Sequence, residues 1–177
     1  MTACIIAVIA VFSAISIYSY QKVPNVDVSE MPFGIIWGTS LEEAEKKMES
    51  LGYTKYVENE GPTQKIVYTV TNYHGMEGVN GQAFLLFDEN FKCNEIILYF
   101  QSIDTANGMC DKNIMKSYYK SLRKSLNSQY EQVSNDYLED YEYWSDDSVF
   151  ITMFYNEPQS LTIDYADKNN IAEELKN

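Results

Sequence analysis

The stretch PFGIIWGTSLEEAEKKMESLGY, residues 32–53, carries the sharpest fold signals in the chain. Its apolar run at 33–37 predicts a strand, which gives way to a helix at 40–51. The SLEE motif that starts this helix fits a capping box, in which the serine and the last glutamate accept each other's backbone amide hydrogens. Gly52 stands where a left-handed C-terminal cap requires no Cβ atom. The apolar stripe of the helix recurs at steps of three and four: Leu41, Ala44, Met48 and Leu51.

Three segments rich in β-branched and aromatic residues follow this helix, at 65–71, 83–87 and 94–101. Such runs are typical of strands. The Asp-Glu-Asn sequence at 88–90 supplies a turn, so the second and third segments are predicted to form a hairpin. A glycine-punctuated connection at 73–81 separates the first two segments.

A second helix is predicted from an N-cap at Asp111 to about Tyr130. Three more strands are expected after it, at 136–144, 149–155 and 160–165, separated by turn sequences rich in Asp, Ser, Asn and Pro. The stripe of the second helix is apolar and aromatic: Met115, Tyr118, Tyr119, Leu122 and Leu126.

The repeated order of one helix and three strands indicates an α+β fold built from two αβββ units. Hairpin-length connections favour an antiparallel sheet with the helices packed on one face. We divide the chain into an N-terminal hydrophobic export segment at 1–20, a tether at 21–31 and an α+β domain at 32–177. The two halves of the domain are about 32–109 and 110–177.

The N-terminus indicates export. No residue from Thr2 to Tyr18 is charged, and 3–12 is an unbroken apolar run. Its length suits a signal-peptide core of about 7–15 residues better than a membrane span of about 20. Small residues in Ala14-Ile15-Ser16 allow cleavage there, but the run can also extend into an uncleaved anchor, and a buried N-terminal helix is a third reading. We expect an extracytoplasmic protein that is secreted, periplasmic or membrane-anchored.

Composition limits the partners. The chain of 177 residues is 45% hydrophobic and 14% aromatic, which is enough for a core. Its net charge of −13 repels phosphate backbones and anionic lipids. We therefore expect no nucleic-acid binding, and membrane contact only through the N-terminal segment. A basic protein partner, a cation or solubility alone would each explain the charge.

The cysteines leave two alternatives open. Cys93 and Cys110 are predicted either to pair in an oxidising compartment or to be buried thiols. A bridge closing a loop of about 17 residues would stabilise the fold by roughly 3 kcal/mol. Cys4 lies inside the apolar run, away from the place of a lipid-modification site.

Few residues of the chain are in patterns that indicate catalysis. His74 is the only histidine, so any Ser-His-Asp or Cys-His arrangement would have to use it. The chain has no Cys-x-x-Cys and no histidine pair, which excludes zinc, and the carboxylates between 136 and 147 match no calcium loop. We therefore predict no catalytic, metal or cofactor residues; paired carboxylates among the 26 acidic residues are the alternative.

Aromatic residues are the more informative excess, because the chain has 15 tyrosines. On a sheet face they can form a binding surface for protein or sugar. Core packing and cross-strand pairs are the alternative explanation. The candidate surface residues are Tyr137, Tyr141, Tyr143 and Trp144.

The chain from residue 33 to residue 53 resembles the start of small exported bacterial proteins of unknown function. The resemblance is carried by FGIIWGTS at 33–40, the helix after it and Leu51-Gly52-Tyr53. The stretch is also similar to the outer-membrane assembly lipoproteins and the β-lactamase inhibitor protein. This resemblance implies small helix-plus-antiparallel-sheet units that act as binding modules. The matching residues are structural, so no functional residue is transferred: Trp37, Gly38, Ser40 and Gly52.

These observations predict an exported bacterial protein that binds and does not catalyse, with another envelope or extracellular protein as its partner. The alternative is an extracytoplasmic hydrolase with paired carboxylates. A third hypothesis is a toxin-neutralising protein whose acidic face docks on a basic partner.

Overall fold

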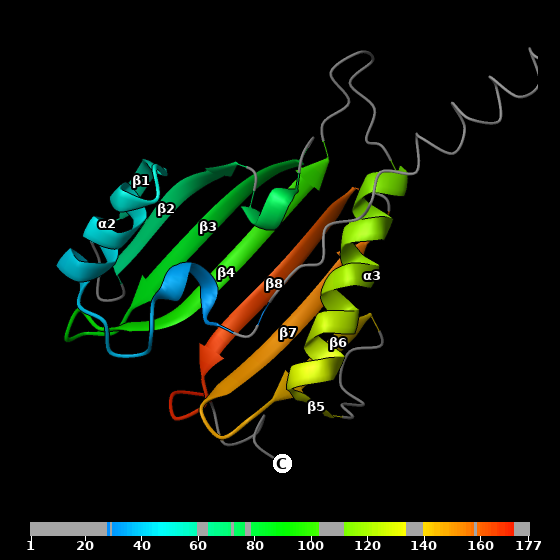
Figure 1. Cartoon of the computed structure of the whole chain (residues 1–177). Helices are drawn as coiled ribbons and strands as arrows, with labels where there is room; N and C mark the ends of the chain where they lie inside the picture. Colours follow the sequence, from blue (N-terminus) through cyan, green and yellow to red (C-terminus); the bar gives the residue numbers. More distant parts are fainter. Residues whose placement is uncertain are drawn as a thin grey trace, which may run out of the picture.

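The computed structural model describes residues 28, 30–59, 64–71, 73–76, 79–102, 112–133, 140–157 and 159–171. Within these residues the chain forms an α+β fold, with one eight-stranded antiparallel sheet and two α-helices (Figure 1). The export segment, the tether up to residue 27, Cys110 and Tyr137 lie outside the described residues. None of the described helices is both long and apolar enough to cross a membrane.

Each α-helix is followed by a meander of four strands. The sheet order is β1-β2-β3-β4-β8-β7-β6-β5, so the two meanders join through the antiparallel pair β4 and β8. The first unit contains α2 (Leu41–Ser50), β1 (Thr54–Asn59), β2 (Gln64–Thr71), β3 (Val79–Phe87) and β4 (Cys93–Ser102). The second contains α3 (Lys112–Gln129), β5 (Glu131–Val133), β6 (Tyr141–Ser145), β7 (Val149–Asn156) and β8 (Ser160–Asp167).

This topology corrects the expected three strands per helix to four. The additional strands, β1 and β5, are the two outer strands of the sheet. β1 has the mixed sequence TKYVEN, and β5 has only three residues, all exposed. Polar, short edge strands resist pairing with other chains, and for the same reason they lack the apolar signature that predicts a strand.

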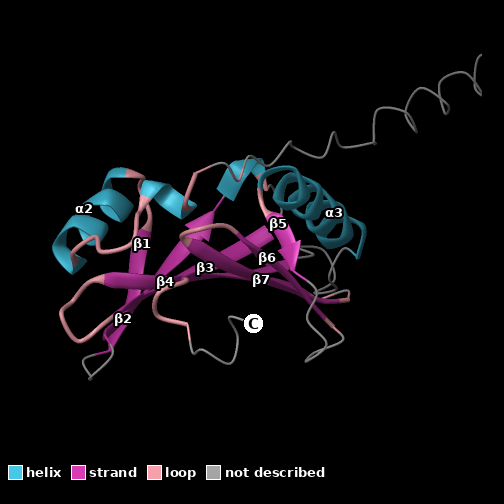
Figure 2. Cartoon of the chain, turned by 90° about the horizontal axis from the view of Figure 1, so that it is seen from below, coloured by secondary structure: helices cyan, strands magenta, loops and turns pink. Residues whose placement is uncertain are grey.

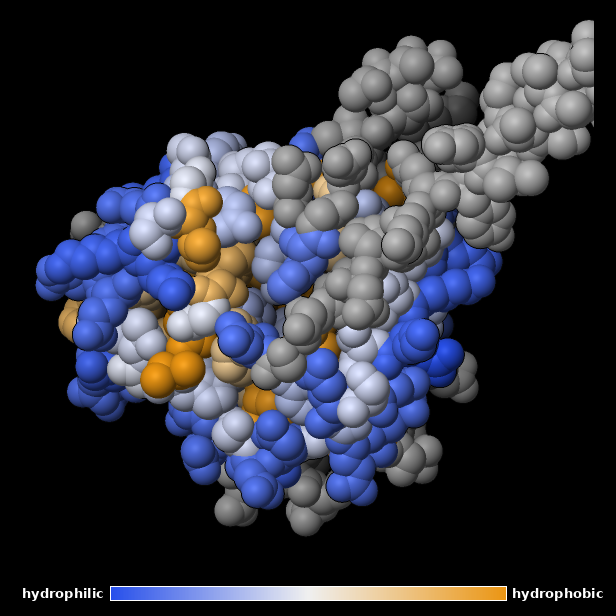
Figure 3. Space-filling model, in the orientation of Figure 1, coloured by the Kyte–Doolittle hydropathy of each residue, from blue (hydrophilic) through white to orange (hydrophobic). Residues whose placement is uncertain are grey.

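Both helices pack on the same face of the sheet (Figure 2). Ala44 and Met48 from α2 and Met115, Leu122 and Leu126 from α3 are completely buried against it. In the space-filling view, hydrophilic surface covers the outer sides of the two helices, and hydrophobic patches lie in the strip between them (Figure 3). The core therefore lies in one layer between helices and sheet.

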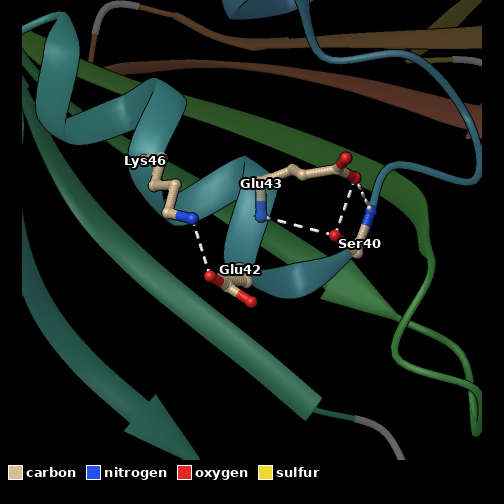
Figure 4. A network of polar contacts seen from close by, with 4 residues as sticks. All are labelled: Ser40, Glu42, Glu43 and Lys46. Atoms are coloured by element: carbon tan, nitrogen blue, oxygen red, sulfur yellow. Dashed lines mark hydrogen bonds and ion pairs between the residues drawn. The ribbon is translucent and has the colours of Figure 1, made fainter.

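The capping box that starts α2 is confirmed (Figure 4). The backbone amide of Glu43 donates to Ser40 Oγ at 3.4 Å, and the backbone amide of Ser40 donates to Glu43 Oε2 at 3.1 Å. Lys46 Nζ pairs with Glu42 Oε1 at 2.6 Å one turn away. Gly52 has the predicted left-handed conformation, with φ of 79°.

The apolar run at 33–37 is not a strand, which corrects the prediction. Residues Pro32–Gly34 form a short 3₁₀ turn, η1, in which Phe33 has φ of 61°. The amide of Ile35 donates to the Pro32 carbonyl at 3.1 Å instead of to a neighbouring strand. Its side chains have separate environments: Ile35 is 1% exposed, whereas Ile36 is 67% exposed. Trp37 Nε1 donates across the domain to the Ser148 carbonyl at 3.1 Å.

Strand β6 begins at Tyr141, later than the 136 expected from the sequence, and residues 134–139 lie outside the described residues. The other predicted strands are confirmed, and β3 extends further toward the N-terminus than expected. The second predicted helix is confirmed as α3, although its expected cap, Asp111, lies outside the described residues.

Candidate functional site

The strand register divides the sheet residues between two faces. In β4, Ile96, Leu98 and Phe100 point toward the helices and are at most 1% exposed. Glu95 and Ile97 alternate with them and point away. No helix of the described residues lies on that second side, which we call the open face (Figure 2).

The open face carries apolar and aromatic side chains interleaved with uncharged polar ones, mostly Thr, Gln, Asn and Ser. The register places Phe84 of β3 beside Ile97 of β4, and Tyr99 of β4 beside Thr162 of β8. Thr162 is flanked on its other side by Phe154 of β7. Strand β6 continues the surface, because the Tyr141 ring stacks on Phe154 with centroids 4.7 Å apart. The partly exposed apolar and aromatic side chains of this face are Phe84, Leu86, Ile97, Tyr99, Tyr141 and Phe154.

The aromatic residues predicted from sequence divide between the two faces. Tyr141 and Tyr143 lie on the open face, where Tyr143 is only 6% exposed. Trp144 points to the opposite side, is 0% exposed and donates from Nε1 to Asn127 Oδ1 of α3 at 2.7 Å. Trp144 is therefore a core residue and not part of a binding surface. Tyr137 lies outside the described residues.

Two carboxylates lie among the apolar side chains of the open face, and the sequence did not single out either. Asp164 of β8 stands between Ile97 of β4 and Thr152 of β7. Glu95 of β4 stands opposite Ala166, diagonally adjacent to Asp164 on the same face. One carboxylate comes from each half of the domain, and both lie at the seam where the two meanders join.

The environment of Asp164 disfavours its charge. Its Oδ1 atom is buried and has no hydrogen-bond partner among the described residues. Burial, followed by the repulsion of Glu95, raises the pKa of Asp164 to about 7. Burial also raises the pKa of Glu95 above the ordinary value of a glutamate. A protein that needed this face only for its fold would be more stable with neutral side chains here.

Positive charge on the open face is limited. Lys65 of β2 is the one Lys or Arg that the described register places there. Its Nζ atom lies 5.3 Å from the centre of the Phe84 ring, a cation–π contact. It forms no ion pair with Glu95 or Asp164 in the part of the chain that the structure describes.

The other candidate residues do not form a reactive site. His74 is exposed, and its ring contacts Tyr73 with centroids 4.2 Å apart. Cys93 is a free thiol and 1% exposed. Burial raises the pKa of this thiol to about 12, so it is a poor nucleophile at neutral pH. Of the two alternatives predicted for the cysteines, the structure has Cys93 as a buried free thiol, and Cys110 lies outside the described residues.

A hollow of about 420 Å³ lies beside α2, away from the open face. It is lined by residues 34–39 with Glu43 and Lys47. Ile36 is 67% exposed at its rim, and the Glu43 carboxylate is already committed to the capping box. No three His, Cys, Asp or Glu side chains of the described ranges gather as metal ligands.

Comparison with protein-family models gives no match, and neither do comparisons with curated proteins or with solved structures. The resemblance carried by residues 32–53 therefore stays a prediction. The open face is thus a sheet surface with aromatic and aliphatic side chains in both meanders and two carboxylates near its centre.

Proposed function

We propose that this chain is an exported binding protein of the cell envelope or extracellular space, and that it docks a protein partner on the open face. The observation that supports this proposal is a sheet face that presents aromatic and aliphatic side chains from both meanders and has no described helix over it. Aromatic side chains are enriched where proteins bind one another, because they provide rigid apolar area with a polar tip.

The dimensions of the face fit such a role. The five central strands, β2, β3, β4, β8 and β7, have eight to ten residues each. At ~3.3 Å per residue and ~4.8 Å between strands, they span about 26 by 24 Å, on the order of 600 Å². A stable protein interface buries about 800 Å² on each partner, so the central strands with β6 provide nearly enough area.

Export is part of the proposal and rests on the uncharged segment from Thr2 to Tyr18. Mass spectrometry of the protein from its native host tests it. We expect an envelope or culture fraction that contains either a product cleaved near Ala14–Ser16 or the intact anchored chain. A cytoplasmic product with an intact N-terminus would contradict export.

Docking can be tested by site-specific photocrosslinking in the native host. A photoreactive amino acid replaces Tyr99 or Phe154 on the open face and, as controls, Glu42 or Lys120 on the exposed sides of the helices. We expect one protein to crosslink from the two open-face positions and not from the controls. Crosslinks from the helix positions alone would contradict the proposal.

The alternative function is hydrolysis by paired carboxylates, and one observation favours it: Glu95 and Asp164 share a face and both have raised pKa values. Glycosidases hold such a pair in a cleft that encloses the substrate, whereas this pair lies on an open sheet surface. Turnover of a glycoside or ester panel that is lost in both Glu95→Gln and Asp164→Asn would favour the alternative.

A further inference from the structure

Glu95 and Asp164 have no explanation in the fold. A sheet face that docks an apolar partner requires no carboxylate at its centre, and an ionised carboxylate there is costly to bury in an interface unless a counter-charge meets it. The Oδ1 atom of Asp164 is already buried without a hydrogen-bond partner among the described residues. Asp164 as a whole is partly exposed on the open face, so a partner would meet this residue from its exposed side and not at Oδ1.

The neighbouring strands supply no cation to these carboxylates. β7 presents Phe150, Thr152 and Phe154 toward Asp164, none of which ionises. β4 presents Glu95, Ile97 and Tyr99, of which Glu95 adds negative charge. Two strands further along the sheet, the ammonium group of Lys65 lies over the Phe84 ring. The centre of the open face is therefore an acidic position surrounded by apolar, aromatic and threonine side chains.

We propose that the partner inserts a lysine or arginine side chain, flanked by apolar side chains, against Asp164 and Glu95. The inference rests on the proposed docking function and deepens it by naming the chemistry of the partner. Arginine fits best, because its planar guanidinium can meet two carboxylates at once and can stack on a ring such as Tyr99 or Phe154. The net charge of −13 would also speed the approach of a basic partner.

The ionisation of Asp164 then controls the affinity. Glu95 from β4 is the charged group that faces it, with Tyr99 further along the same strand. The one ionisable residue of β7, Tyr155, lies on the helix side of the sheet, away from Asp164. The pKa of Asp164 near 7 means that the carboxyl is largely protonated at about pH 5.5, when a cation gains little from it. Binding should therefore tighten as the pH rises from about 5.5 to about 8.

A peptide selection tests the inference with defined probes. The full-length chain, kept in solution by a mild nonionic detergent, is screened at about pH 8 against a random peptide library displayed on phage. We expect enriched peptides to carry one Arg or Lys flanked by aromatic or aliphatic residues. The affinity of one such peptide is then measured by fluorescence anisotropy for the native chain and its variants.

We expect Asp164→Asn to lower the affinity for this peptide by about tenfold or more and Glu95→Gln to lower it by less. The exposed control Asp147→Asn should leave the affinity unchanged. Replacing the peptide's arginine by citrulline should weaken binding to the native chain and cause little further loss with Asp164→Asn, because the two changes remove the same interaction. The Asp164→Asn variant should also lose the pH dependence.

The possible failures are distinguishable. This inference would be overturned, and the docking function left intact, by enriched peptides that contain no Lys or Arg. Such peptides would no longer bind the Phe154→Asp variant of the protein but would still bind the Asp164→Asn variant. Binding that is unaffected by both Phe154→Asp and Tyr99→Asp would overturn the docking function itself. A concentration-dependent dimer that Phe154→Asp abolishes would make a second copy of this chain the occupant, which would also overturn the inference.

Discussion

Replacing Asp164 by asparagine should stabilise the fold at neutral and alkaline pH. The folded protein raises the pKa of this carboxyl from 3.8 to about 7, mainly through burial. The folded state therefore holds a proton that the unfolded chain releases between these two values. The stability that comes from this group is complete below the unfolded pKa and is lost as the pH rises through the folded pKa. Asparagine carries no charge at any of these pH values, so it avoids the loss.

The magnitude follows from the size of the shift. About three pKa units at ~1.4 kcal/mol each give an upper limit of about 4 kcal/mol. Asp164 is partly exposed, so water lowers this figure, and we expect the free energy of unfolding to rise by about 1–3 kcal/mol at pH 8. The difference between the variant and the native chain should be close to zero at about pH 4.

Urea unfolding at a series of pH values between about 4 and 8 measures this difference. Tryptophan fluorescence is a suitable signal, since Trp144 is completely buried. Asp147→Asn is the matched control: it removes the same charge from an exposed turn and corrects for the general effect of the net charge. If Asp164→Asn and Asp147→Asn change stability equally at every pH, the account of the buried carboxylate is wrong.

Three further predictions concern the fold. Ser40→Ala removes the two hydrogen bonds that the Ser40 hydroxyl makes with Glu43 and keeps the bond from the Ser40 backbone amide, so urea unfolding should show a loss of about 1 kcal/mol. The control Ser128→Ala removes only a bond from an exposed hydroxyl to the Ser125 carbonyl of the same helix and should show a smaller loss. Leu98→Ala, in the strand that joins the two meanders, should lower the free energy of unfolding by about 2–5 kcal/mol; a loss below 1 kcal/mol would contradict the single core. Cys93 should resist iodoacetamide in the native protein, because its thiol is buried and has a pKa of about 12, and it should react after unfolding in urea. Mass spectrometry follows the alkylation. Rapid alkylation of the native chain would show that the thiol is not buried.

The sequence was sufficient for elements whose signals are local. The signals of the α2 helix lie within residues 40–52, and its predicted capping box and glycine are confirmed. Of the predicted stripe, Ala44 and Met48 are buried, whereas Leu51 follows the helix and is 47% exposed. Central strands were also found, because burial on one or both faces requires β-branched and aromatic residues there. The outer strands β1 and β5 were missed, since they are exposed and their composition resembles that of loops.

The run at 33–37 was misassigned for a related reason. An apolar run predicts a buried segment, although only part of this run is buried, and it does not indicate which groups accept the backbone amide hydrogens. In η1 the carbonyls of residues just before them accept these hydrogens, so the chain turns where a strand would continue.

The candidate site required the strand pairing. The sequence SLTIDYAD of β8 alternates, with Leu161, Ile163 and Tyr165 buried and Asp164 on the other face. That alternation is visible in the sequence, yet it does not show that β8 pairs with β4. Only this pairing brings Glu95 of the first half next to Asp164 of the second.

The position of the two carboxylates at this seam would link the proposed binding to folding. Each meander contributes one of them, so neither half alone presents both. Their raised pKa values mean that the folded chain gives up stability to hold two acids side by side in an apolar surface. Natural proteins tend to break local rules of stability at functional positions, where a ligand compensates for the loss. A basic side chain from a partner would remove the cost, and the stability gained by Asp164→Asn measures how large that cost is before the partner binds.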